Sequence, residues 1–122
     1  MSPVLLGNSF PLSLIRRPVI IEPRPLADLQ RAAAKCGFLS FWGHSNTLSA
    51  ARSVLGFDPT PPVERPALKL DDAKLPSIGG QTFSEVWVLS PDYFPGFRPK
   101  IGEEVSSQEI RGWEALRVQF PP

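Results

Sequence analysis

The sequence contains few of the residues that build disulfide bonds or metal centres. Of its 122 residues, one is a cysteine, Cys36, and one is a histidine, His44. A lone cysteine cannot form an internal disulfide bond, and one cysteine with one histidine cannot supply the four ligands of a structural zinc ion. We therefore expect a protein that works without a metal ion or other cofactor.

Long apolar runs and a signal peptide are also missing. No apolar stretch approaches the roughly 20 residues needed to cross a bilayer. The first residues lack the apolar core and cleavage site of a secretory signal. These features predict a cytoplasmic protein that has no membrane partner.

Neither sign of charge is in excess. Thirteen Lys and Arg against twelve Asp and Glu give a net charge of +1, so no broad basic field would attract long nucleic acid. An anionic ligand would have to be held by local groups. The hydrophobic fraction of 42% is typical of an ordered globular protein, and the length fits one core, so we expect residues 1–122 to form a single domain.

Apolar and β-branched runs bounded by Gly, Pro or Asn predict the strands. The predicted strands are residues 4–6, 19–21, 64–70, 83–89 and 116–120. The third and fourth are joined through Gly79 and Gly80, a connection too long for a tight hairpin.

Helical spacing of apolar residues predicts two helices that pack on the sheet. The first follows Pro25, which can sit in a first helical turn, and ends at Gly37. The second has Ser45 as its N-cap and ends at Gly56. A shorter third helix would begin at a capping box formed by Ser106 and Glu109 and end at Gly112. Residues 90–102 contain too many Pro and Gly for regular structure and predict an aromatic loop. The expected fold is a small α/β domain with about five strands in a mixed sheet covered by helices.

His44, between Gly43 and Ser45, is the leading candidate for chemistry. A helix start presents unpaired N–H groups that can hold a phosphate, and Gly43 would let a ligand approach the backbone. A histidine beside that phosphate could donate a proton to a departing oxygen. The alternative is that His44 only makes a hydrogen bond within its turn.

Other candidates surround this segment in the predicted fold. Asn8 follows the first strand, where its amide could meet a ligand or simply close its own turn. Arg65 and Arg98 could grip a phosphate or lie on the surface. Tyr93 and Phe94 are the aromatic residues that we expect near a ligand or a partner, although aromatic residues mainly fill cores.

The order of these positions resembles the viral ring nucleases that act as type III anti-CRISPR proteins, together with their bacterial relatives. The resemblance covers nearly the full length. The matching positions are Asn8 and Phe10 after the first strand, the segment 40–44 with His44, Thr47, Leu55 with Gly56, Arg65 before residues 67–70, and Arg98 with Gly102.

Members of this family are small homodimers that bind cyclic tetra-adenylate across the dimer axis and cut it without metal. The resemblance implies that a ribose 2′-hydroxyl attacks its own phosphate and that His44 protonates the leaving 5′-oxygen. Asn8 and Arg98 would hold the phosphates. The other candidate ligand-binding residues are Ser9, Phe10, Gly43, Ser45, Arg65, Tyr93 and Phe94.

Three departures from the family pattern leave three hypotheses open. Ile101 stands where the motif carries a glutamate, and Pro11 where it has a serine, while residues 91–97 resemble an insertion. Losing one helper group can slow catalysis by about 10²-fold to 10⁴-fold without abolishing binding. The first hypothesis is a ring nuclease, the second is a sponge that only sequesters a cyclic nucleotide, and the third is a structural or regulatory virus-type protein. In each case we expect the protein in the cytoplasm, which is that of the host cell if the protein is viral.

Overall fold

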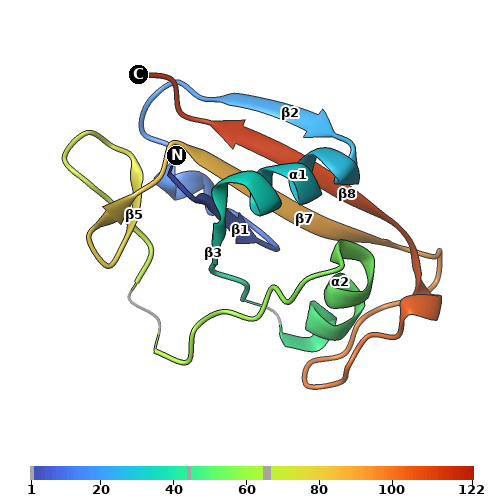
Figure 1. Ribbon diagram of the computed structural model, residues 1–122. Coiled ribbons are helices and arrows are strands. Elements are labelled where there is room, and N and C mark those ends of the chain that lie inside the picture. The colour runs from blue at the N-terminus through green and yellow to red at the C-terminus, as the bar shows by residue number, and fades with distance from the viewer. Residues whose placement is uncertain (1, 44, 65–66) are drawn as a thin grey trace.

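The main sheet is mixed and has five strands (Figure 1). The computed structural model describes residues 2–43, 45–64 and 67–122. The strands lie in the order β2, β8, β7, β1, β3. They comprise Ile20–Arg24 (β2), Ile110–Gln119 (β8), Glu85–Tyr93 (β7), Val4–Gly7 (β1) and Phe38–Ser40 (β3). β1 runs parallel to β3 and β7, whereas β8 is antiparallel to β2 and β7. The predicted α/β fold with a five-stranded mixed sheet is confirmed.

β1 lies inside the sheet and is covered on both faces. Val4, Leu5 and Leu6 are at most 3% exposed, which explains why this strand is a continuous apolar run rather than an alternating one. Val4 and Leu6 pack in one hydrophobic cluster, and Leu5 packs in another.

The first cluster joins the sheet to its two α-helices. These helices are α1 (Leu26–Cys36) and α2 (Leu48–Leu55). Leu29 of α1 and Leu55 of α2 pack with Leu6 and Trp87, so both helices cover the same face. Pro25 is the N-cap of α1 rather than part of its first turn, so that detail of the prediction is wrong. Gly56 ends α2 in the left-handed conformation (φ 80°), where glycine has no steric cost, as predicted.

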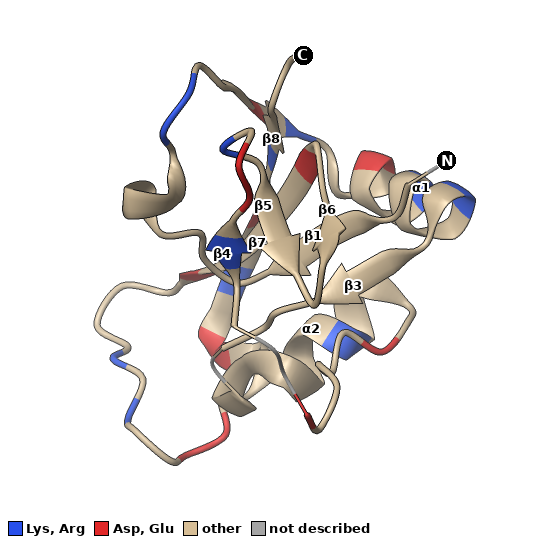
Figure 2. Cartoon of the chain, turned by 90° about the vertical axis from the view of Figure 1, so that its left-hand side faces the viewer, with Lys and Arg blue, Asp and Glu red and all other residues tan. Residues whose placement is uncertain are grey.

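A second, smaller sheet covers part of the opposite face. Its strands are β4 (Lys69–Leu70), β5 (Pro76–Ile78) and β6 (Gln81–Thr82). Figure 2 shows β5 and β6 in front of the main sheet, and Ile78 packs with Leu5.

The predicted strand 64–70 is therefore mostly wrong. Of its described residues, only Lys69 and Leu70 form a strand, and they pair with β5 rather than in the main sheet. The pairing with β5 follows from Asp71, whose carboxylate accepts hydrogen bonds from the N–H groups of Ala73 and Leu75, both at 2.9 Å. This Asx-type turn reverses the chain immediately after β4.

β7 and β8 form a long antiparallel pair, which corrects two further predictions. β7 continues through Ser90 to Tyr93, a stretch assigned to the aromatic loop. Pro91 is tolerated because β1 ends opposite Val88, and within the described residues β8 is then the only strand beside this part of β7. Gly112 lies inside β8 instead of ending a helix.

The predicted third helix is a single 3-10 turn, η3 (Ser107–Glu109). Its predicted cap is present, because Ser106 Oγ accepts a hydrogen bond from the Gln108 N–H at 3.2 Å. β8 begins directly afterwards at Ile110, and the chain has no room for a longer helix.

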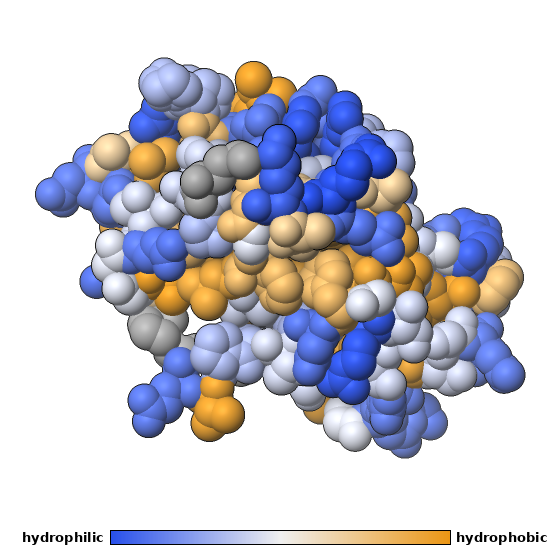
Figure 3. Space-filling model, viewed as in Figure 1, coloured by the Kyte–Doolittle hydropathy of each residue, from blue (hydrophilic) through white to orange (hydrophobic). Residues whose placement is uncertain are grey.

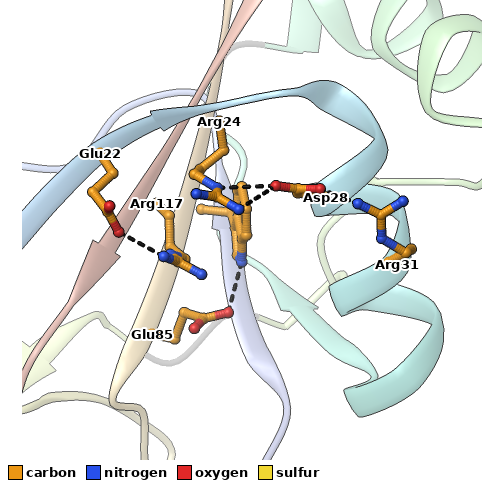
Figure 4. A network of polar contacts seen from close by, with 7 residues as sticks. Glu22, Arg24, Asp28, Arg31, Glu85 and Arg117 are labelled. Atoms are coloured by element: carbon orange, nitrogen blue, oxygen red, sulfur yellow. Dashed lines mark hydrogen bonds and ion pairs between the residues drawn. The ribbon is translucent and has the colours of Figure 1, made fainter.

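Ion pairs join β2, β8 and α1 at one side of the molecule (Figure 4). Arg117 lies 2.5 Å from Glu22, and Asp28 lies between Arg24, at 2.6 Å, and Arg31. The hydrogen bond from Arg117 lowers the pKa of Glu22, and the hydrogen bond from Arg24 lowers the pKa of Asp28. The same bond to Glu22 raises the pKa of Arg117. The network therefore favours the ionised form of each partner.

Charged residues are spread over the surface, and an apolar band crosses one face. Figure 2 shows Lys and Arg intermixed with Asp and Glu over the chain, and Figure 3 shows an apolar band across the middle of the face that carries the helices. Among the described residues, no helix is long and apolar enough to traverse a bilayer.

Candidate functional site

The candidate site lies where the parallel strands end. Asn8 follows β1, Gly43 comes three residues after β3, and Tyr93 is the last residue of β7. Since β1 is parallel to both neighbours, their carboxyl ends meet at one edge of the sheet. Open α/β sheets bind ligands at this edge.

Asn8 connects the end of β1 to the turn that carries Gly43. Its Oδ1 accepts a hydrogen bond of 2.8 Å from the Gly43 N–H. Because an N–H can bond only the oxygen of the amide, this contact fixes the orientation of the side chain. The Gly43 N–H and the Asn8 Oδ1 are therefore engaged with each other.

Buried hydrogen bonds also hold the turn that carries Gly43. Trp42, 1% exposed, donates from its indole Nε1 to Thr47 Oγ1 at 3.1 Å and from its backbone N–H to Ser40 Oγ at 3.2 Å. Ser40 Oγ donates in turn to the Pro59 carbonyl at 2.5 Å. Gly43 is thus placed by a buried neighbour whose polar groups are satisfied.

Ser45 is not the cap of α2. It begins a 3-10 turn, η2 (Ser45–Thr47), and α2 starts at Leu48 with Thr47 as its N-cap and no side-chain capping bond. The bond from Trp42 to Thr47 spans five residues and allows one tight turn before the helix. The predicted helix-start phosphate site at residues 43–45 is therefore displaced by one turn from the actual start of α2.

Two adjacent hollows open at this edge. One, of about 270 Å³, is lined by Asn8, Ser9, Asn46, Thr47, Pro91, Tyr93 and Pro99. The other, of about 320 Å³, is lined by Gly43, Ser45, Asn46, Pro99, Lys100, Ile101 and Gly102. We call them the first and second hollow. Asn46 and Pro99 belong to both and form the wall between them.

The loop from residue 94 to 106 supplies the outer side of both hollows. Figure 1 shows it in orange beside α2. The Val105 N–H donates to the Asn46 carbonyl at 2.8 Å, and the Val105 side chain, 3% exposed, packs with Ala50 and Ile110. The loop is therefore attached to the turn that follows Gly43.

Tyr93 is held firmly in the first hollow. It follows a β-bulge at which Asp92 pairs with Gly112 and Tyr93 pairs with Ile110. Its ring packs on Phe97 with a centroid distance of 5.2 Å. Burial raises the pKa of its hydroxyl, so Tyr93 is a neutral hydrogen-bonding group near pH 7.

The structure brings only some of the predicted site residues together. Asn8, Ser9 and Tyr93 line the first hollow, whereas Gly43 and Ser45 line the second. His44 and Arg65 lie outside the described residues.

The other predicted residues lie apart from these hollows. Phe10 packs edge-on against Phe41 and Phe120 in the hydrophobic cluster that contains Leu5. Phe94 is 46% exposed and lines neither hollow. Arg98 faces a third hollow, which it shares with Lys100, Glu103, Glu104 and Glu109.

Asn46 and Lys100 are the residues that sequence reasoning missed. Asn46 lies in η2, one residue beyond Ser45, and Lys100 lies two residues beyond Arg98. Both are polar and lie close to predicted site residues in the sequence, and this proximity is the signal that could have identified them. Within the described ranges, no three or more His, Cys, Asp or Glu side chains are grouped to hold a metal ion.

The whole chain has the fold of a known viral protein. It is similar to B116 of Sulfolobus turreted icosahedral virus. The TM-score is 0.61 at 15% sequence identity, and the match covers 97% of this chain and 99% of that one. No protein-family model and no curated protein matches the chain. At this identity, the likeness establishes the fold alone.

Proposed function

We propose that the protein binds a cyclic oligonucleotide of the cyclic oligoadenylate class and cleaves it without a metal ion. The observation that carries this proposal is the hydrogen bond from Gly43 to Asn8. It joins Asn8, at the end of β1, to Gly43, the residue that precedes His44 in the sequence. The two hollows beside it offer space for a ligand.

In the proposed reaction, a ribose 2′-hydroxyl attacks the adjacent phosphorus and the bond to the 5′-oxygen breaks. His44 donates a proton to the departing 5′-oxygen, and the proton of the 2′-hydroxyl passes to solvent. Asn8 donates from its NH₂ group to a phosphate oxygen, and Arg98 holds a second phosphate from the loop after β7. The product is a linear oligonucleotide with a cyclic phosphate, which would end the signal of an antiviral messenger.

The test of this function is incubation with cyclic di-, tri- and tetranucleotides in the presence of EDTA, with the products separated by chromatography. We expect linear products from at least one ring. In His44→Ala, cleavage should fall by about 10²-fold or more while affinity changes little, because the group acts mainly in the transition state. Cleavage by His44→Ala at the native rate would refute the mechanism.

Ile101 favours a second candidate, a sponge that binds the ring without cutting it. This residue is fully exposed and lines the second hollow beside Gly43 and Ser45. The resemblance expects a glutamate there, so the carboxylate that would assist His44 or the 2′-hydroxyl is replaced by an apolar side chain. Tight binding with the ligand recovered intact would support the sponge, and cleavage gained by Ile101→Glu would identify the missing carboxylate as the reason.

The proposed ligand also implies a homodimer. A symmetric ring is most simply bound across a twofold axis, and one chain of this size offers limited concave surface. Sedimentation should therefore give a dimer at micromolar concentration. A monomer that still binds the ring would refute the shared site, while failure to bind any cyclic nucleotide would favour a structural or regulatory role.

A further inference from the structure

The two hollows are adjacent and chemically different. They have Asn46 and Pro99 in common, so a ligand that passes over these two residues would contact both hollows. The first hollow has flat faces and amide groups, and the second has a lysine. A nucleotide has the same division, with a flat base at one end and an anion at the other.

The first hollow suits a base. Pro91 and Tyr93 supply flat surfaces, and the contact of Tyr93 with Phe97 holds its ring in place before any ligand arrives. A preorganised aromatic ring loses little entropy when a base stacks against it. Asn46 adds an amide, which carries both a donor and an acceptor and can therefore read the edge of a base.

The second hollow suits a phosphate better than the third does. Lys100 is its cation, beside the hydroxyl of Ser45, and its described lining contains no carboxylate. The third hollow, which Lys100 also lines, brings Arg98 together with the carboxylates of Glu103, Glu104 and Glu109. These three carboxylates make the third hollow less attractive to a phosphate than the second, because like charges destabilise one another at short range.

We infer that the paired hollows bind one nucleotide of the ligand, with its base in the first hollow and its phosphate in the second. Asn46 determines which base is accepted, and Lys100 holds the phosphate. This inference rests on the proposed function for the identity of the natural ligand. A ring has one phosphate for each nucleotide, so Lys100 and Arg98 hold different ones.

The experiment titrates the four nucleoside 5′-monophosphates and cyclic tetra-adenylate into the native protein and three variants, with binding followed by calorimetry and by amide chemical shifts. Asn46→Ala should reduce the ratio between the best and the worst base by about tenfold. Lys100→Ala should weaken all four by about tenfold and reduce the salt dependence of binding. Lys35→Ala is the matched control. It removes the same charge from an exposed position on α1 and should leave affinity unchanged.

The outcomes separate the two proposals. The fold should survive in Asn46→Ala because the bond to Val105 uses the Asn46 backbone carbonyl, and circular dichroism checks this. Mononucleotide binding with the expected effects, but no binding of the ring, would support the paired hollows and refute the proposed function. Ring binding that neither Asn46→Ala nor Lys100→Ala alters would refute the paired hollows alone. If neither kind of ligand binds at millimolar concentration, both proposals are wrong.

Discussion

Replacing Asn8 with Asp and with Ala can separate the structural role of this residue from its role in binding. The Asn8 Oδ1 accepts from the Gly43 N–H at 2.8 Å, and its NH₂ group is the part proposed to meet a phosphate. Aspartate keeps an oxygen for Gly43 but replaces the NH₂ donor with a second, negatively charged oxygen. Alanine removes both atoms.

The expected magnitudes follow from the exposure of the contact. Gly43 is exposed, so water can replace the lost acceptor, and Asn8→Ala should lower the free energy of unfolding by only about 0.5 to 1.5 kcal/mol. Asn8→Asp should leave that free energy nearly unchanged. It should nevertheless weaken binding of the ring by about 1.5 to 3 kcal/mol, roughly 10-fold to 150-fold, because a hydrogen bond to a charged phosphate is lost.

Urea denaturation measures the first quantity and isothermal calorimetry the second. Native affinity in Asn8→Asp would show that the amide does not face a phosphate, and the proposed site would then lose its central residue. Native stability in Asn8→Ala would show that the bond to Gly43 does not hold the turn in place.

Three further predictions concern the loop, the sheet and the ion pairs. Arg98→Ala should weaken ring binding by about 1.5 to 3 kcal/mol in calorimetry, and unchanged affinity would remove Arg98 from the site. Gly7→Ala should lower the urea midpoint by the equivalent of about 1 to 3 kcal/mol, because a Cβ at residue 7 would lie 2.6 Å from the Phe41 ring. Gly112→Ala is the control and should leave the midpoint unchanged, because a Cβ at residue 112 would meet nothing within 4 Å. The Glu22 pKa is lowered in the folded state, so its contribution to stability is present above its ordinary value of 4.5 and is lost as the pH falls below it. Thermal melts should show this decline, and Glu22→Gln should reduce it; an unchanged pH profile in the variant would show that this ion pair contributes nothing.

The central part of the fold was predictable because its signals are local. The run from Val4 to Leu6 is apolar throughout, and the helical spacing from Leu26 to Cys36 ends at a glycine. Such patterns record burial on one or both faces directly in the residue types. The strand order and the second sheet depend on which distant segments meet, and a single sequence does not record that.

The errors arose where tertiary contacts overrule local preference. Pro91 normally breaks a strand, yet it belongs to β7 because one neighbouring strand has already ended. Ser45 has the residue type of a cap, yet the contact between Trp42 and Thr47 delays the helix. At the site, Asn8 and Gly43 could be predicted from their positions in the sequence. Asn46 and Lys100 are brought to the hollows by the way the loop after β7 folds, which the sequence pattern does not indicate.

The position of β8 has a consequence for how the protein is made. This strand is the last one that the structure describes, yet it lies inside the sheet between β2 and β7, and β2 has no other strand partner among the described residues. A growing chain on the ribosome would therefore expose one edge of β7 and all of β2 until residue 119 has emerged. Exposed strand edges pair readily with other chains. Because these contacts also join distant parts of the sequence, completion of the sheet should be the slow step of folding, and the nascent chain should be most prone to aggregation until residues 110–119 become available for pairing.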